Sequence, residues 1–170
     1  MKHALAALAI LGIGLAHAGG EAVRLPGPGL ELAGRLYRPA GEGPFPAIVM
    51  LHGCSGLWGR GGEPTASFAF WAEHFRSRGY VALLLDSFGP RGETEICTQA
   101  RRSISPATDR PRDAHAALAW LASQPGVDAG RIDLIGWSNG GTAVLHAVKD
   151  PAPGISSGGL RFRAAVAFYP

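Results

Sequence analysis

The chain has 170 residues and a formal net charge of +3, with 46% hydrophobic and 17% charged residues. This composition predicts a globular protein, and the length is typical of one domain. The small positive excess is carried by scattered arginines, which argues against nucleic acid as a partner.

The first 18 residues read MKHALAALAILGIGLAHA, a basic start followed by an apolar run and an Ala-His-Ala end. This pattern predicts a secretory signal peptide that is cleaved after Ala18. A membrane anchor is the alternative, but the apolar run is shorter than the roughly 20 residues that a spanning helix needs. We therefore expect a periplasmic or secreted protein, free of the membrane after cleavage, with its domain in residues 19–170.

Residues 21–39 alternate apolar and polar side chains around a Pro-Gly-Pro-Gly turn, which predicts two short antiparallel strands. Continuous apolar runs follow at 47–51, 81–85, 132–135 and 164–168. Apolar runs without alternation fit strands that are covered on both faces. The runs therefore predict a mostly parallel sheet.

Segments with helical spacing separate these runs. Residues 67–78 and 111–123 each carry an apolar stripe. A third helix is expected to begin after Ser138 and to end near Asp150-Pro151. Strands that alternate with helices predict an α/β fold in which helices cover both faces of the sheet.

Ligands bind such sheets beyond the carboxyl ends of the strands, so the loops after the apolar runs are where chemistry is expected. One of these loops reads Gly136-Trp137-Ser138-Asn139-Gly140 and matches G-x-S-x-G between a predicted strand and a predicted helix. The motif predicts a strained turn that presents Ser138 as a nucleophile, with glycines that leave room for neighbouring backbone. The alternative is a Gly-Ser turn that only caps the helix.

A second glycine-rich loop, LHGCSG at 51–56, follows the apolar run at 47–51. Its backbone can supply an N–H donor to a developing oxyanion, and Cys54 N–H is the candidate. Asn139 N–H would be the second donor. His52 is a possible catalytic base, but a histidine at this place is expected to order the loop instead.

Three motifs, HGCSGLW at 52–58, GYVALLLDSFGPRG at 79–92 and RIDLIGWSNGG at 131–141, occur in this order and together resemble the dienelactone hydrolase family. The resemblance covers residues 22–170 and implies an α/β-hydrolase fold. It also implies hydrolysis of an ester, lactone or related acyl bond of a small molecule by a nucleophile, a histidine and an acid. Founding members carry cysteine as the nucleophile. Ser138 makes the chain more similar to serine-bearing exported relatives, and dienelactone itself is not the expected substrate.

In this fold the triad acid and the triad histidine follow the nucleophile. The 32 residues after Ser138 contain one acid, Asp150, and one histidine, His146. Both fall roughly 12 to 18 Å along the expected third helix, too far to reach the hydroxyl. We therefore expect 19–170 to be the N-terminal portion of a hydrolase domain that lacks its last strands, its acid and its base. The alternative, from another class, is a non-catalytic binding or scaffold domain that lost the triad.

The two cysteines, Cys54 and Cys97, are expected to form a disulfide in an exported protein, with two free thiols as the alternative. Neither these cysteines nor the histidines show the spacing of a zinc site. The sequence also contains no phosphate loop and no dinucleotide motif. No metal or cofactor is therefore expected.

Residues in the loops after the strands have two possible roles each. Arg91 could hold a substrate carboxylate, because a guanidinium suits bidentate recognition, but a structural pairing with Asp86 or a backbone carbonyl is favoured. Trp58 and Phe88 could line an acyl pocket or could simply pack. His115, on the helix at 111–123, is expected at the surface.

Overall fold

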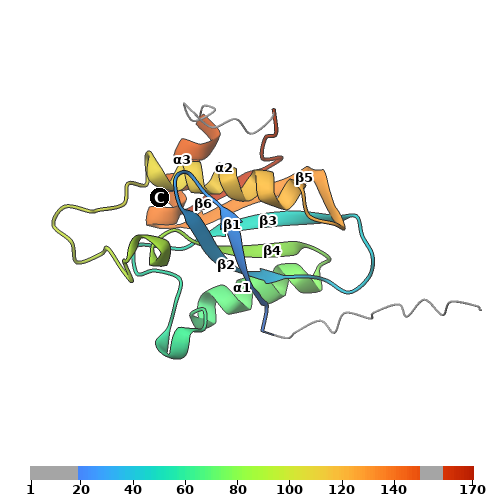
Figure 1. The fold of residues 1–170 in the computed structure, drawn as a ribbon, viewed down its shortest axis with the longest axis horizontal. Coiled ribbons are helices and arrows are strands. Elements are labelled where there is room, and N and C mark those ends of the chain that lie inside the picture. Colours follow the sequence, from blue (N-terminus) through green and yellow to red (C-terminus); the bar gives the residue numbers. More distant parts are fainter. Residues whose placement is uncertain (1–18, 150–158) are drawn as a thin grey trace, which may run out of the picture.

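The computed structural model describes residues 19–149 and 159–170. In this part of the chain, six strands form one sheet with the order β1-β2-β4-β3-β5-β6 (Figure 1). The strands are β1 (Glu21–Pro26), β2 (Glu31–Tyr37), β3 (Phe45–Leu51), β4 (Val81–Asp86), β5 (Val127–Trp137) and β6 (Ala165–Phe168). β1 and β2 pair antiparallel, as do β2 and β4, and the other pairs are parallel. The predicted hairpin and the predicted mostly parallel sheet are therefore confirmed.

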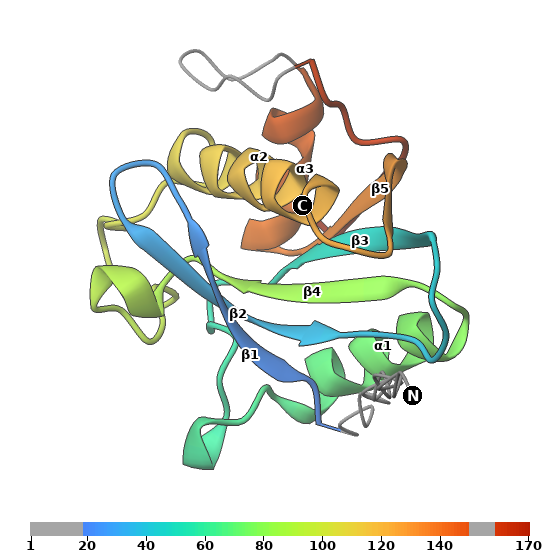
Figure 2. The ribbon, with the colours of Figure 1, turned by 45° about the vertical axis from the view of Figure 1, so that its right-hand side comes forward.

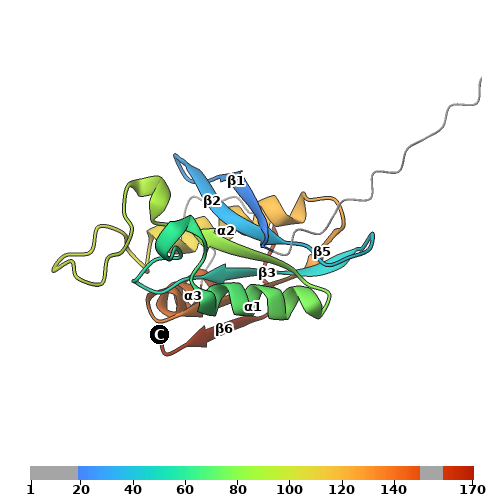
Figure 3. The same cartoon turned by 90° about the horizontal axis from the view of Figure 1, so that it is seen from below.

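Helices cover both faces of this sheet (Figures 2 and 3). α1 (Ala66–Ser77) lies on one face, and α2 (Asp109–Ala122) and α3 (Asn139–Lys149) lie on the other. Short 3₁₀ helices, η1 (Arg60–Gly62) and η2 (Gly89–Arg91), lie in the loops after β3 and β4. Within 19–149 and 159–170, no helix is long and apolar enough to cross a membrane. The predicted signal peptide and the predicted end of the third helix lie outside the described residues.

Two separate apolar clusters explain why the central strands read as continuous apolar runs. In β4, Val81, Leu83 and Leu85 belong to the cluster beneath α2 and α3, whereas Ala82 and Leu84 belong to the cluster beneath α1. All five side chains are at most 1% exposed. Because successive residues of a strand point to opposite faces, a strand covered on both sides has no polar positions.

One strand differs from its predicted extent, and another differs from its predicted burial on both faces. β5 begins at Val127, earlier than the predicted 132–135, because pairing of Phe45 with Val127 extends the strand through residues of low β-propensity. β6 matches its predicted position, but it is the outermost described strand, and Val166 and Phe168 are 47% and 36% exposed.

The register of the parallel strands gathers three loops at one edge of the sheet. Leu51, the last residue of β3, pairs with Leu85 of β4 and with Gly136 of β5. The loops after these strands therefore begin side by side. They are the loops in which the sequence predicts chemistry.

Candidate active site

Ser138 occupies a sharp turn between β5 and α3. Its φ is +52°, a left-handed conformation that residues with a Cβ rarely adopt. Its N–H donates to the Phe168 carbonyl of β6 (3.0 Å), and its carbonyl accepts from Thr142 N–H of α3 (2.9 Å). The side chain is partly exposed, and its hydroxyl has no hydrogen-bond partner among the described residues. Backbone contacts on both sides thus hold the turn and leave the hydroxyl free.

The glycines of the motif are required by close backbone approach. A Cβ on Gly136 would lie 2.3 Å from the carbonyl oxygen of Gly140, and a Cβ on Gly140 would lie 2.3 Å from that of Leu51. Real Cβ atoms do not approach that closely, so both positions exclude a side chain. The steric reason predicted from the sequence is present in the structure.

The loop after β3 passes directly beside the serine. A Cβ built on Gly53 would lie 3.7 Å from Ser138 Cβ. Among the described residues, the N–H groups of Cys54 and Asn139 donate to no acceptor. The two predicted donors are therefore unpaired. One lies in the loop after β3, and the other lies at the start of α3.

His52 is fully buried beneath this loop. Its Nδ1–H donates to the Gly53 carbonyl (2.8 Å), its Nε2 accepts from Ser87 N–H (3.4 Å), and its ring packs edge-on against Phe88. Burial, and then the charge of Arg110, hold the pKa of His52 well below its ordinary value of 6.5. The ring is neutral and both nitrogens are occupied. This geometry agrees with a role in ordering the loop.

A disulfide joins Cys54 to Cys97, which confirms the predicted pair. Beside it, Ile96 N–H donates to the Cys54 carbonyl (2.8 Å). Further along, Trp58 Nε1 donates to Asp86 Oδ2 (2.6 Å). These contacts fasten the loop after β3 to the segment after β4.

Arg91 pairs with Asp113 rather than with Asp86. Its Nη1 and Nη2 donate to the two Asp113 oxygens (2.8 and 2.9 Å), and Nη1 also donates to the Ser87 carbonyl (2.7 Å). A backbone carbonyl, one of the two structural partners expected for Arg91, is therefore present, and the carboxylate that Arg91 also binds is Asp113 because packing of α2 brings it to the loop. Burial raises the pKa of Asp113, and Arg91 opposes that rise. Both terminal nitrogens of Arg91 are engaged, and its binding of a substrate carboxylate stays a prediction.

Asp86 is unavailable to Arg91 because it organises its own loop. Its Oδ1 accepts from the N–H groups of Phe88 (2.9 Å) and Gly89 (3.0 Å). Phe88 is 1% exposed and packs in a small cluster with Ile96 and Ile104, which favours the packing alternative over a pocket-lining role.

The burial of two residues of α2 was not predicted from the sequence. His115, expected at the surface, is 7% exposed and donates from Nε2 to the Ala147 carbonyl of α3 (3.0 Å). Arg110 is 0% exposed and donates from Nη1 to Asn139 Oδ1 (2.7 Å). Arginine at a helix start is usually solvated, so the sequence carries no signal for this burial.

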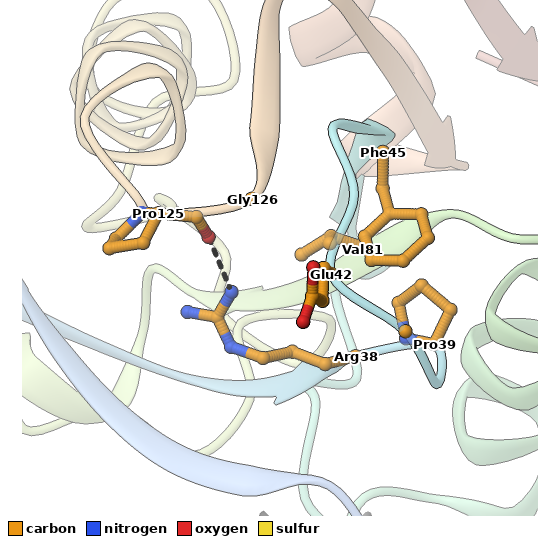
Figure 4. Close-up of a pocket in the computed structure, with 8 residues that line it drawn as sticks. Arg38, Pro39, Glu42, Phe45, Val81, Pro125 and Gly126 are labelled. Carbon is orange, nitrogen blue, oxygen red and sulfur yellow. Dashed lines mark hydrogen bonds between the residues drawn. The ribbon is translucent and has the colours of Figure 1, made fainter. Parts of the chain in front are cut away.

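A cavity of about 300 Å³ opens at the opposite edge of the sheet (Figure 4). It lies where β3, β4 and β5 begin, not where they end, so it is remote from Ser138. Its lining consists of Arg38, Pro39, Gly41, Glu42, Phe45, Val81, Pro125 and Gly126. Within the part of the chain that the structure describes, no three His, Cys, Asp or Glu side chains group as metal ligands would.

The sheet, its two helical layers and the strained serine at the end of β5 define the class of the protein as an α/β-hydrolase. The family model described as X-Pro dipeptidyl-peptidase (S15 family) matches residues 28–157. The chain belongs to this family, which is of the α/β-hydrolase type.

The curated relatives of the chain include a lactonase and a thiohydrolase. The chain is 29% identical over 127 residues to a Bradyrhizobium protein named Probable 2-oxo-3-(5-oxofuran-2-ylidene)propanoate lactonase, covering 72% of this chain and 48% of the relative. It is 35% identical over 119 residues to a thiohydrolase of Aspergillus aculeatus, covering 70% of this chain and 34% of the relative. The chain thus spans between a third and a half of the length of these relatives.

Solved structures confirm the fold. A protein named as a dienelactone hydrolase from Klebsiella pneumoniae superposes with a TM-score of 0.66 at 21% identity, covering 88% of this chain and 59% of the other. Esterase 2 from Thermogutta terrifontis superposes with a TM-score of 0.59 at 28% identity, covering 87% of this chain and 55% of the other. The resemblance to dienelactone hydrolases is therefore confirmed at the level of the fold.

Proposed function

We propose that this chain is the N-terminal portion of a serine hydrolase domain that cleaves an ester, lactone or related acyl bond, with Ser138 as the nucleophile. The observation that carries this proposal is the turn at Ser138. A left-handed residue with a free, partly exposed hydroxyl is held between a buried strand and a helix. Strained backbone of this kind persists where the surrounding structure enforces it, and it clusters at functional sites.

The two unpaired N–H groups supply the second element of the proposed chemistry. Ser138 Oγ attacks the acyl carbonyl carbon while the general base takes the hydroxyl proton. The C=O π bond breaks, and the carbonyl oxygen that becomes negative accepts hydrogen bonds from the N–H groups of Asn139 and Cys54 until the intermediate collapses and expels the leaving group. The N-terminus of α3, which begins at Asn139, adds a positive partial charge at the same point. The site therefore stabilises charge that exists only in the transition state.

We assign the general base and the acid to residues outside this sequence. His52 is neutral, buried and engaged on both nitrogens. His146 lies on the exposed side of α3, roughly 12 Å along the helix axis from Ser138. The curated relatives are two to three times longer than the matched segment, which leaves room for the missing groups in a longer chain.

The names of the relatives support an acyl substrate. They include a lactonase and a thiohydrolase, and the structural neighbours include an esterase that is phosphorylated by paraoxon. The family itself is described as an X-Pro dipeptidyl-peptidase. Aryl esters, lactones, thioesters and X-Pro amides are therefore the substrates to compare.

The test is labelling of the full-length protein with a fluorophosphonate probe, followed by peptide mass spectrometry. The probe is expected to modify Ser138 in the wild-type protein and to leave the Ser138→Ala variant unmodified. Ser123→Ala is the matched control, because Ser123 is an exposed serine at the end of α2. Equal labelling of wild type and Ser138→Ala would show that Ser138 is not the nucleophile, whereas a folded protein that is neither labelled nor active toward any of the four substrate types would favour the scaffold alternative.

We also propose that the protein is exported. The disulfide between Cys54 and Cys97 supports this, since such bonds persist in oxidising compartments. Fractionation of cells that express the full-length gene is expected to place the protein outside the cytoplasm, and recovery of the reduced protein from the cytoplasm would contradict the proposal.

A further inference from the structure

Arg110 is a buried cation without a matching anion. Its side chain is 0% exposed, and within the described residues no carboxylate pairs with it. Nη1 donates to Asn139 Oδ1, and the guanidinium stacks over the Phe88 ring at 5.1 Å, but Nε and Nη2 have no hydrogen-bond partner in residues 19–149 and 159–170. Burial of an unpaired charge is costly, so a fold that keeps one at this position needs a reason.

The two carboxylates whose charge acts on Arg110 are already occupied. Asp113 receives both terminal nitrogens of Arg91, and Asp86 accepts from Trp58 and from two backbone N–H groups. They interact with Arg110 only through space. Burial lowers the pKa of Arg110 to about 10, which still leaves the side chain protonated at neutral pH. The positive charge is therefore retained inside the domain.

The contacts of Arg110 lead to both proposed oxyanion donors. Its hydrogen bond to the Asn139 side chain fixes the residue that carries one donor. On its other side, Phe88 packs against His52, which donates to the Gly53 carbonyl. That carbonyl and Cys54 N–H belong to the same peptide group, so the second donor is held through the same cluster.

From these contacts we infer that Arg110 is a positioning residue of the oxyanion site, which acts through the Asn139 side chain to hold the Asn139 N–H in place. The inference rests on the proposed function, because it needs an oxyanion at Ser138. It accounts for the burial of Arg110, since an N–H donor is effective only when its direction is set before the charge develops. A displacement of about 1 Å is enough to reduce the rate substantially.

The test is steady-state kinetics of the full-length protein on its best substrate. Arg110→Met is expected to lower kcat about 30-fold, less than the roughly 100-fold or greater loss that removal of a whole donor causes, with KM changed less than about threefold. Asn139→Ala keeps the backbone N–H but loses the side-chain acceptor, so a similar loss is expected. The double variant is expected to lose no more than either single variant, and Arg110→Lys, which keeps a cationic donor, is expected to lose less.

His115→Gln is the matched control. It alters another buried α2 side chain that contacts α3, but at Ala147, far from Asn139 along the helix. It is expected to lower the unfolding midpoint while kcat is unchanged. If Arg110→Met does not fold, Asn139→Ala reports on the same contact.

Three outcomes would overturn the inference. Wild-type kcat in Arg110→Met would exclude the positioning role while leaving the proposed function intact, and so would independent, additive losses from Arg110→Met and Asn139→Ala. Turnover by a wild-type protein that is not labelled at Ser138 would refute the proposed function, and the role of Arg110 with it.

Discussion

Cys54 and Cys97 are joined by a disulfide that fastens the loop after β3, beside Ser138, to the segment after β4. The bridge closes a loop of 43 residues. In this loop lie α1 and β4, so the constraint acts on about a quarter of the chain. The same bond holds the residue whose N–H we assign to the oxyanion.

Removal of this bond is expected to reduce both stability and turnover. Chain-entropy estimates for a loop of this length predict a loss of about 4 kcal/mol in the free energy of unfolding for the Cys54→Ser/Cys97→Ser variant. Urea unfolding of the wild type with and without reductant measures the change. The double variant is insensitive to reductant, and an unchanged urea midpoint in the reduced wild type would contradict the prediction.

Two glycines of β5 are expected to respond differently to alanine. Gly136→Ala places a Cβ 2.3 Å from the Gly140 carbonyl oxygen and is expected to destabilise the domain by about 3 kcal/mol. Gly130→Ala is the matched control, since its nearest neighbour would be Asp128 Oδ1 at 3.4 Å, an ordinary contact. A change within about 0.5 kcal/mol is expected there. Thermal unfolding of both variants tests the pair, and equal shifts would show that the turn tolerates a side chain.

The conformation of Ser138 predicts a conflict between activity and stability. Because φ is +52°, Ser138→Gly is expected to relieve strain and to raise the free energy of unfolding by about 1 kcal/mol relative to Ser138→Ala. Both variants lack the hydroxyl and are expected to escape the fluorophosphonate label. Chemical denaturation distinguishes them, and a Gly variant no more stable than the Ala variant would argue against strain.

His52 predicts a specific loss of stability in mild acid. Its pKa in the folded chain lies well below 6.5, so between these values the unfolded chain binds a proton that the folded chain does not. Stability is therefore full above pH 6.5 and falls as pH is lowered below it, by at most about 1.4 kcal/mol per pH unit.

The measurement is the free energy of unfolding between pH 7.5 and 5.5 in wild type and His52→Asn. Asparagine can still donate to the Gly53 carbonyl but does not titrate, so a shallower slope is expected. Ser123→Ala keeps His52, removes no titratable group and serves as the control with the wild-type slope. Identical slopes in wild type and His52→Asn would mean that His52 is not the group responsible.

Much of the architecture could be read from local patterns. The alternation on either side of Pro26 and Gly29 predicted the β1–β2 hairpin, and the apolar runs predicted β3, β4 and β5 because both faces of these strands are covered. Each of these features depends on residues close in sequence. The start of β5 was missed because its first residues are ordered by pairing with Phe45 across the sheet.

The carboxylate partner of Arg91 and the burial of Arg110 could not be read in this way. Asp113 lies 22 residues beyond Arg91, and Asn139 lies 29 residues beyond Arg110. Many acidic and amide side chains are available at such separations. Which of these side chains contact Arg91 and Arg110 is decided only by how α2 packs against the sheet and α3.

The sequence by itself determined the turn at Ser138, the glycines that the turn requires and the order of strands and helices, because these depend on steric limits and periodicity among neighbouring residues. The tertiary structure alone decided which charges are paired, which histidines are buried, and that Arg110 is buried beside Asn139 with no carboxylate partner among the described residues. Long-range packing sets those contacts, and no local pattern encodes it.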